Sequence, residues 1–135
     1  MIRTCLLAAA AAALMAVGAP AAPLPGYVNA AIADSARPVD DTKRDEDRKP
    51  GQMLVFAGIK PGSKVMDLIP GGGYFTRIFA KVVGPTGWVY AFSPAEIDPL
   101  IAKRFPGVDI KKQFAAYNNV SVLHADIVKI GRAHV

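Results

Sequence analysis

Cysteine and histidine are nearly absent from this sequence, and their scarcity narrows the chemistry available to it. Cys5 is the only cysteine, and the two histidines are His124 and His134. No His, Asp or Glu residues are spaced like metal ligands, and no Gly-x-Ser-x-Gly motif marks a nucleophilic serine. We therefore expect no metal site, no disulfide and no catalytic thiolate.

Concentrated charge is missing as well. The sequence has 16 Lys and Arg against 11 Asp and Glu, a formal net charge of +5, but the basic residues are dispersed along the chain. No block of Lys and Arg is interleaved with aromatic residues, as it is in many nucleic-acid-binding proteins. We therefore expect no nucleic-acid partner.

Long apolar runs are missing except at the N-terminus. Arg3 precedes the Ala- and Leu-rich residues 6–17, and residues 19–21, Ala-Pro-Ala, fit the small-x-small pattern of a cleavage site. That run is shorter than the roughly 20 residues that a membrane span needs. We expect residues 1–21 to be a signal peptide and the mature protein to be exported, without a stable membrane span. It would be periplasmic if its source is a Gram-negative bacterium.

The last residues have an unusual property. Residues 130–135, IGRAHV, back-translate to ATCGGAAGAGCACACGTC, which looks like a widely used sequencing adapter read in one frame. The alternative is an ordinary polar C-terminus. We expect residues 129–135 to be a non-native tail, and the natural protein to continue beyond about residue 128. No role is given to Arg132 or His134.

The most informative stretch is residues 64–83, where a short apolar run, three glycines and a helical pattern follow one another. Residues 65–69 have the length of a buried parallel strand, with the polar Asp67 just before the turn. After the glycines at 71–73, apolar residues recur at i, i+3, i+4, i+7 and i+8, which predicts an α-helix. These apolar residues are Phe75, Ile78, Phe79, Val82 and Val83.

Glycines between a strand and a helix allow positive φ and a close approach of a ligand to the main chain at the helix N-terminus. Such a turn also occurs where a strand simply reverses direction. The strand–turn–helix context favours a cofactor site, but the motif alone does not name the cofactor.

Two further strands are predicted, at residues 88–92 and 120–123, with a helix between them. Ser93, Pro94 and Glu96 fit the start of that helix, with Ser93 as N-cap and Glu96 completing a capping box. Its inward-facing residues are expected to be Ile97, Leu100, Ile101 and Phe105. Alternating strands and helices imply parallel pairing with right-handed crossovers, an α/β fold.

Residues 22–50 precede this unit and have a different composition. A short helix is predicted over residues 27–36, followed at residues 40–49 by the dense charged run DDTKRDEDRK. Such runs are usually a solvated loop or helix face, which is the favoured interpretation. The alternative is that Arg44, Arg48 or Lys49 reaches over a cofactor or substrate as a lid.

Three motifs together resemble a known family. DLIPGGGYFT at 67–76, GPTG at 84–87 and VYAF at 89–92 look like the N-terminal half of a class I S-adenosylmethionine-dependent methyltransferase. The closest resemblance is to exported, predicted methyltransferases of proteobacteria, in which a signal peptide and an RDxDRKP-like segment precede AGIKPG. The similarity covers about residues 40–128.

The resemblance implies a Rossmann-like, doubly wound parallel sheet that is truncated after about the third strand. The corresponding organisation is a signal peptide at 1–21, an N-terminal helix and charged segment at 22–50, the N-terminal half of the methyltransferase domain at 51–128, and the tail at 129–135.

The resemblance also implies a cofactor site. The family's acid at the end of the first strand and the glycines after it surround the methionine moiety of S-adenosylmethionine, and an acid after the third strand usually faces the adenine. Two positions depart from the family pattern: Ile69, followed by Pro70, stands at its first glycine, and Ser93 stands where an acid binds the ribose, with Glu96 nearby. The implied cofactor-binding residues are Asp67, Ile69, Pro70, Gly71, Gly72, Gly73, Ser93, Glu96 and Asp126.

The implied activity is methyl transfer from S-adenosylmethionine to an unknown acceptor, a small molecule or a component of the cell envelope. Catalytic residues are not assigned, because in the family the groups that touch the acceptor come largely after the fourth strand. His124 is expected to be a structural or hydrogen-bonded histidine. Two alternatives stay open: a non-catalytic binding protein on the same scaffold, and a dinucleotide-dependent oxidoreductase, although its Gly-x-Gly-x-x-Gly motif and its acid after the second strand are absent.

Overall fold

The computed structural model describes residues 23–130. The predicted signal peptide at 1–21 lies outside the described residues, and so do residues 131–135 of the predicted tail. Three parallel strands form one sheet in the order β1-β2-β3. The strands are β1 (Lys64–Leu68), β2 (Trp88–Pro94) and β3 (Val120–Ala125). The predicted α/β fold with a parallel sheet is confirmed.

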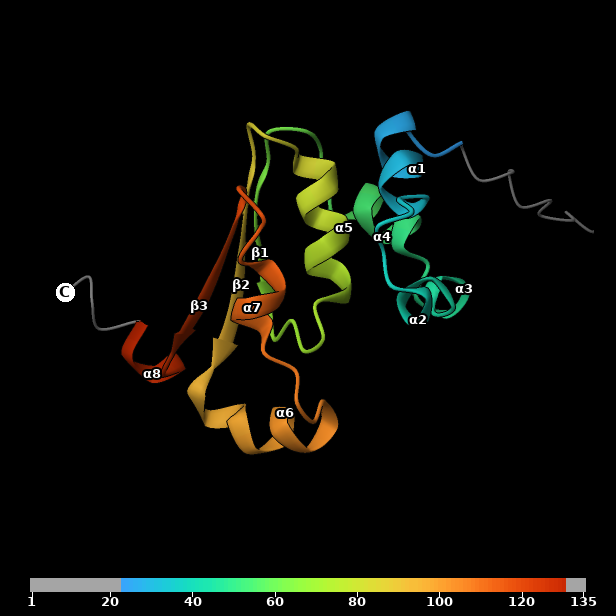
Figure 1. Ribbon diagram of the computed structural model, residues 1–135. Helices are drawn as coiled ribbons and strands as arrows, with labels where there is room; N and C mark the ends of the chain where they lie inside the picture. The colour runs from blue at the N-terminus through green and yellow to red at the C-terminus, as the bar shows by residue number, and fades with distance from the viewer. Residues whose placement is uncertain (1–22, 131–135) are drawn as a thin grey trace, which may run out of the picture.

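Short helices surround the sheet. In chain order they are α1 (Gly26–Ile32), α2 (Val39–Thr42), α3 (Asp45–Arg48), α4 (Pro50–Phe56), α5 (Tyr74–Val83), the 3-10 helix η1 (Ala95–Ile97), α6 (Asp98–Arg104), α7 (Ile110–Phe114) and α8 (Ile127–Ile130). Figure 1 shows α5 between the sheet and the N-terminal helices α1 to α4, with α6 beyond the carboxyl end of β2. None of the helices in residues 23–130 is long and apolar enough to cross a membrane.

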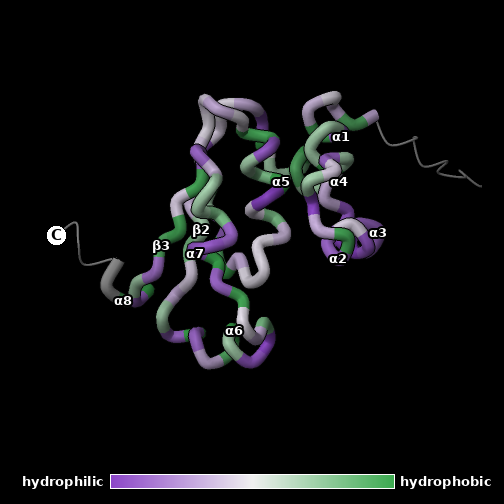
Figure 2. The backbone as a smooth tube through the Cα atoms, viewed as in Figure 1, coloured by the Kyte–Doolittle hydropathy of each residue, from purple (hydrophilic) through white to green (hydrophobic). Residues whose placement is uncertain are grey.

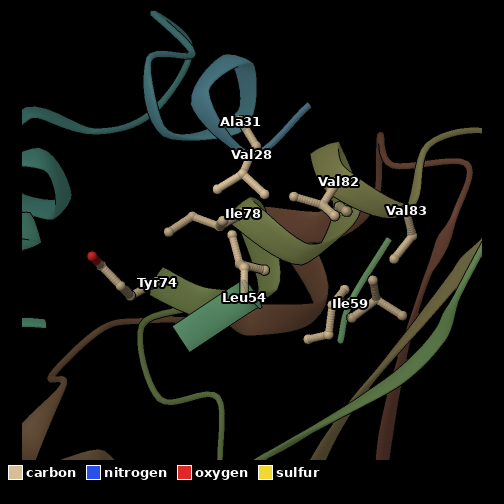
Figure 3. Packing of buried hydrophobic residues seen from close by; sticks show 10 residues of the cluster. Val28, Ala31, Leu54, Ile59, Tyr74, Ile78, Val82 and Val83 are labelled. Atoms are coloured by element: carbon tan, nitrogen blue, oxygen red, sulfur yellow. The ribbon is translucent and has the colours of Figure 1, made fainter. Parts of the chain in front are cut away.

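Helix α5 is the centre of the hydrophobic core. Its apolar spacing was the clearest helical signal in the sequence, and Ile78, Val82 and Val83 are fully or almost fully buried. One face of α5 packs on β2 of the sheet, and the other packs against α1, where Val28 lies beside Ile78 (Figure 3). Because α5 packs on both sides, the N-terminal helices and the sheet share one core. Full burial of each such side chain contributes about 1.5–3 kcal/mol.

Glycines with positive φ flank α5, and a side chain from outside the helix binds its C-terminal end. Gly73, with φ of 79°, precedes the helix, and Gly84, with φ of 64°, follows it. The Asn119 side chain donates hydrogen bonds from Nδ2 to the carbonyls of Ala80 (2.8 Å) and Gly84 (3.0 Å). These bonds satisfy carbonyl groups at the end of the helix and tie it to the start of β3.

The sheet face turned away from α5 is less covered within the described residues. Met66 and Leu68 of β1 are 58% and 54% exposed, and Leu123 of β3 is 40% exposed. Figure 2 shows green, hydrophobic segments along α5 and the strands, and mostly purple, hydrophilic colouring at α3. The protein therefore presents an apolar sheet face together with a charged N-terminal surface.

Two sequence predictions about the region after β2 were wrong. No capping box forms, because β2 continues to Pro94 and the side-chain oxygen of Glu96 instead accepts a hydrogen bond from the Ile127 backbone N–H (2.9 Å). Leu100, expected to face inward, is 63% exposed. Leu100 stays exposed because the short α6 lies beyond the carboxyl end of β2 and does not cover the face of the sheet (Figure 1).

The prediction that the charged run 40–49 is a solvated loop or helix face was wrong in part. This run forms α2 and α3, and the carboxylate of Asp41 is buried. Its neighbour Arg37 is also buried, with an exposure of 6%. Because a buried charge is costly unless it is paired, Asp41 and Arg37 each require a partner of opposite charge within the structure.

Candidate cofactor site

Asp67 lies near the carboxyl end of β1 and is largely buried, with an exposure of 9%. Its Oδ2 accepts a hydrogen bond of 2.6 Å from Oγ1 of Thr76, a residue on the first turn of α5. Burial raises the pKa of Asp67 above its ordinary value, while the hydrogen bonds from the Thr76 side chain and main chain act in the opposite direction. A desolvated carboxylate at the end of a parallel strand is typical of a ligand site.

The turn after β1 follows a glycine-like path. Gly71 and Gly73 have positive φ angles of 53° and 79°. Ile69 also has a positive φ, of 62°. The Ile69 N–H donates to the Phe92 carbonyl (2.9 Å), and the Gly73 N–H donates to that of Pro70 (2.8 Å). Positive φ is rare for a β-branched residue, so Ile69 adopts a glycine-like backbone conformation at the cost of local strain.

A side chain at either of two glycines would have to displace a neighbouring aromatic ring. A Cβ atom at Gly71 would lie 2.8 Å from the Phe105 ring, and one at Gly73 would lie 2.6 Å from the Phe114 ring. The missing Cβ atoms therefore let aromatic side chains from α7 and from the end of α6 close over the turn.

A cavity of about 200 Å³ lies between this turn, the N-terminal helices and α6. Acidic, backbone, aromatic and basic groups all contribute to its wall. The lining residues are Arg44, Arg48, Asp67, Leu68, Ile69, Pro70, Gly71, Gly72, Tyr74, Phe75, Ile101 and Phe105.

The structure brings only some of the predicted site residues into this cavity. Asp67 and residues 69–72 line it together, whereas Gly73 is buried as the residue before α5. Ser93 faces a second hollow of about 330 Å³, which it shares with His124. Ile101 lines both hollows and so stands between them.

The remaining predicted residues are near the carboxyl ends of the other strands. Glu96 is engaged with the Ile127 backbone, as described above, and Asp126 directly follows β3. His124 lies beside Ser93 in the sheet register, and its Nε2 is 2.9 Å from Oδ2 of Asp98. The expectation of a hydrogen-bonded histidine is thus confirmed.

A partly buried polar network, which was not predicted from the sequence, fixes the charged run over the cavity. Asp45 of α3 accepts a hydrogen bond of 2.5 Å from the Tyr74 hydroxyl and bonds of 2.7 and 2.8 Å from the two terminal nitrogens of Arg37. In Figure 3 the Tyr74 hydroxyl points away from the apolar cluster. The Arg37 hydrogen bond lowers the pKa of Asp45, whereas burial, followed by the bond to Asp45, raises the pKa of Tyr74 to about 12.

A second ion pair ties α2 to the glycine turn. Nη2 of Arg77 lies 2.6 Å from Oδ2 of Asp41 and donates a hydrogen bond of 2.8 Å to the Gly72 carbonyl. One feature of the sequence indicated the ion pairs of Asp45 and Asp41: a dense run of acidic residues next to basic ones, close to a turn of the cofactor-binding type. It did not show which carboxylate meets which cation, because the partners are far apart in the chain.

Within residues 23–130, no group of three or more His, Cys, Asp and Glu side chains is placed to hold a metal ion. The site thus combines a buried carboxylate, a glycine turn at a helix N-terminus, and the carboxyl ends of parallel strands. These features define the Rossmann-like class of cofactor-binding domains.

Comparisons with known proteins agree with that class. No family model matches the chain. Ubiquinone/menaquinone biosynthesis C-methyltransferase UbiE of Ectopseudomonas mendocina is 36% identical over 77 residues, which are 57% of this chain and 28% of that protein. Protein-L-isoaspartate O-methyltransferase of Ignicoccus hospitalis is 35% identical over 74 residues, 55% of this chain and 32% of that protein.

Among solved structures, a protein-L-isoaspartate O-methyltransferase superposes on 76% of this chain and 38% of its own, with a TM-score of 0.51 and 16% sequence identity. That likeness shows the fold alone. The curated relatives are methyltransferases, and the chain spans only 28% and 32% of the lengths of the two that are named above.

Proposed function

We propose that this protein is an S-adenosylmethionine-dependent methyltransferase whose cofactor binds at Asp67 and the turn at 69–73. The observation that carries this proposal is the buried carboxylate of Asp67 beside a turn at whose glycines a Cβ would collide with neighbouring rings. The methyltransferase names of the curated relatives support the choice of cofactor.

The residues present fit such a cofactor. The carboxylate of Asp67 suits the positively charged part of S-adenosylmethionine, and the main chain at 69–72 lines the same cavity. The adenosine would extend toward the carboxyl ends of β2 and β3, where Ser93 and Asp126 lie. Ligands of open parallel sheets bind at this edge of the strands.

S-adenosylmethionine supplies an activated methyl group, and the protein's task is mainly to align it with the acceptor. Positioning can account for much of the rate of such a transfer, so no general base is assigned. The proposed acceptor is a small molecule or a component of the cell envelope. The proposed location is outside the cytoplasm, on the strength of the N-terminal sequence pattern.

The comparisons do not favour the two alternative functions. A dinucleotide-dependent oxidoreductase would be expected to bind NAD in preference to S-adenosylmethionine. A non-catalytic scaffold would bind S-adenosylmethionine without forming a methylated product or S-adenosylhomocysteine. Ligand choice and product formation therefore separate all three functions.

The test is a thermal melt of the purified protein with S-adenosylmethionine, S-adenosylhomocysteine or NAD. A ligand that binds only the folded state raises the melting temperature as ln(1 + [L]/Kd). We expect a dose-dependent rise with both sulfur-containing ligands and none with NAD. The absence of any rise at millimolar S-adenosylmethionine would rule out the proposed cofactor.

A further inference from the structure

Two arginines of the charged run face the candidate cofactor cavity. Arg44 precedes α3, Arg48 is its last residue, and both line the cavity together with Asp67 and the glycine turn. Residues four apart lie on the same side of a helical turn. The two guanidinium groups therefore approach the cavity from the same side.

Aromatic rings hold these side chains in place. The Arg44 and Arg48 guanidinium carbons lie 5.4 and 4.6 Å from the centre of the Tyr74 ring, and that of Arg48 is also 5.7 Å from the centre of the Phe75 ring. A cation over an aromatic face within about 6 Å is attracted to it. Tyr74 is itself anchored by its hydrogen bond to Asp45, so the platform beneath the arginines is fixed.

Their electrostatic situation differs from that of the neighbouring arginines. Arg37 is paired with Asp45, and Arg77 is paired with Asp41. Within residues 23–130, no carboxylate forms an ion pair with Arg44 or Arg48. The cavity wall thus carries two guanidinium groups against the single carboxylate of Asp67.

We propose that Arg44 and Arg48 form a carboxylate-binding site, and that they bind the α-carboxylate at the amino-acid end of S-adenosylmethionine. This assignment rests on the proposed function. S-adenosylmethionine has one anionic group, the α-carboxylate, whereas its ammonium and sulfonium groups are cationic. The arginines repel the two cationic groups, and Asp67 attracts them, so opposite charges at the two walls of the cavity fix the orientation of the ligand.

Guanidinium groups suit this task because their planar N–H fork matches a carboxylate and can bind it with two parallel hydrogen bonds. Asp41 and Asp45 of the same run do not compete for the ligand, because they are already paired with Arg77 and Arg37. The charged run therefore has two roles: its acids attach it to α5, and two of its arginines recognise the ligand.

The test is titration calorimetry with S-adenosylhomocysteine, which has the α-carboxylate, and 5′-methylthioadenosine, which lacks the whole amino-acid end. Arg44→Gln and Arg48→Gln are each expected to weaken binding of S-adenosylhomocysteine by about tenfold or more, the scale of a lost charge-assisted bond. Both should leave the affinity for 5′-methylthioadenosine within twofold of wild type. Arg48→Lys, which keeps the charge but not the fork, should fall between wild type and Arg48→Gln.

Lys43→Gln is the matched control. Lys43 belongs to the same run, but it is exposed, pairs with Asp40 and does not line the cavity, so its removal should change neither affinity. Unchanged affinity for S-adenosylhomocysteine in both arginine variants overturns the proposal, and so does an equal loss for both ligands. If the wild type binds neither S-adenosylmethionine nor S-adenosylhomocysteine, the proposed function itself has failed.

Discussion

Asp67 is largely buried, and its negative charge therefore lowers the stability of the folded state. Burial raises the pKa of Asp67, so the folded state favours the neutral acid more than the unfolded state does. A raised pKa contributes stability that is present below the ordinary value of 3.8 and is lost as the pH rises through the folded value. A desolvated carboxylate that costs stability is what a ligand site requires.

We predict that Asp67→Asn raises the melting temperature at pH 7 and that this gain disappears near the ordinary pKa of the acid. The amide oxygen can still accept the hydrogen bond from the Thr76 hydroxyl, so loss of the charge is the main change. Melting curves of both proteins at pH 7 and at acid pH measure the effect. A variant that is less stable than wild type at pH 7 would show that the ionised carboxylate stabilises the fold.

Ile69 stores local strain in the turn. A left-handed backbone costs a residue with a Cβ roughly 1–2 kcal/mol, and glycine gives back about 0.5–1 kcal/mol of this through its greater freedom when unfolded. Ile69 is also 47% exposed, so little burial is lost on truncation.

We therefore predict that Ile69→Gly is neutral or stabilises the protein by up to about 1 kcal/mol. Urea denaturation measures the free energy of unfolding, and Ile69→Val, which keeps the branched Cβ, is the matched control with no gain. A loss of more than about 1 kcal/mol in Ile69→Gly would mean that the isoleucine side chain itself supports the turn.

At the scale of elements, the N-terminal helices are attached to α5 by both apolar and polar contacts. Val28 and Leu54 pack in the core, and Asp45 links α3 to Tyr74 at the start of α5. The attachment places Arg44 and Arg48 over the glycine turn. The geometry of the cavity thus depends on a segment outside the strand–turn–helix unit.

We predict that Asp45→Asn destabilises the protein by about 1–3 kcal/mol at pH 7, because it leaves the buried Arg37 without its ionic partner. The pKa of Asp45 is lowered in the fold, so its contribution is present above the ordinary value of 3.8 and is lost as the pH falls below it. Urea denaturation of wild type and variant at pH 7 and at acid pH tests this.

The exposed Asp47, in the same helix, provides the control substitution Asp47→Asn, which should change the free energy of unfolding little. A similar loss in both variants would mean that the Asp45 bonds contribute no more than general surface charge.

Some elements could be predicted from the sequence because their determinants are local. The period of Ile78, Val82 and Val83 defines α5, and the apolar run before the glycines defines β1. The helix after β2 was predicted less well because Glu96 bonds to Ile127, a residue 31 positions away, in place of its own helix. A short polar motif does not show whether the Glu96 side chain bonds to its own helix or to a distant backbone group.

The candidate site shows the same division. Asp67 and the turn at 69–73 could be predicted because strand, glycines and helix are contiguous in sequence. The separate hollow at Ser93 could not, since its walls come from four different elements. The position of Arg48 over Tyr74 depends on how α3 packs on α5, and the sequence offered it only as an alternative to a solvated face.

At the scale of the whole molecule, the apolar sheet face should govern solution behaviour. Met66 and Leu68 are both more than half exposed, on an edge strand of the described sheet. Exposed apolar strands at a sheet edge favour association. We predict that the 135-residue protein self-associates and binds hydrophobic dyes at micromolar concentration.

Replacing Met66 and Leu68 together by Thr should reduce association without lowering the melting temperature, because Thr suits a strand and little burial is lost. Light scattering after gel filtration measures the association. Replacement of Val108 by Thr is the control, since Val108 is exposed but lies outside the sheet. A monomeric wild type with a cooperative, reversible melt would contradict the prediction.

The most direct test of the proposed cofactor site is hydrogen–deuterium exchange with and without saturating S-adenosylhomocysteine. We expect slower exchange at the backbone amides of residues 68–75, where the turn meets α5, and across residues 44–48. Exchange in α1, which lies beside the C-terminal part of α5 and away from the glycine turn (Figure 1), should be unchanged. Protection confined to other segments, or no protection at millimolar ligand, would contradict the claim that this turn binds the cofactor.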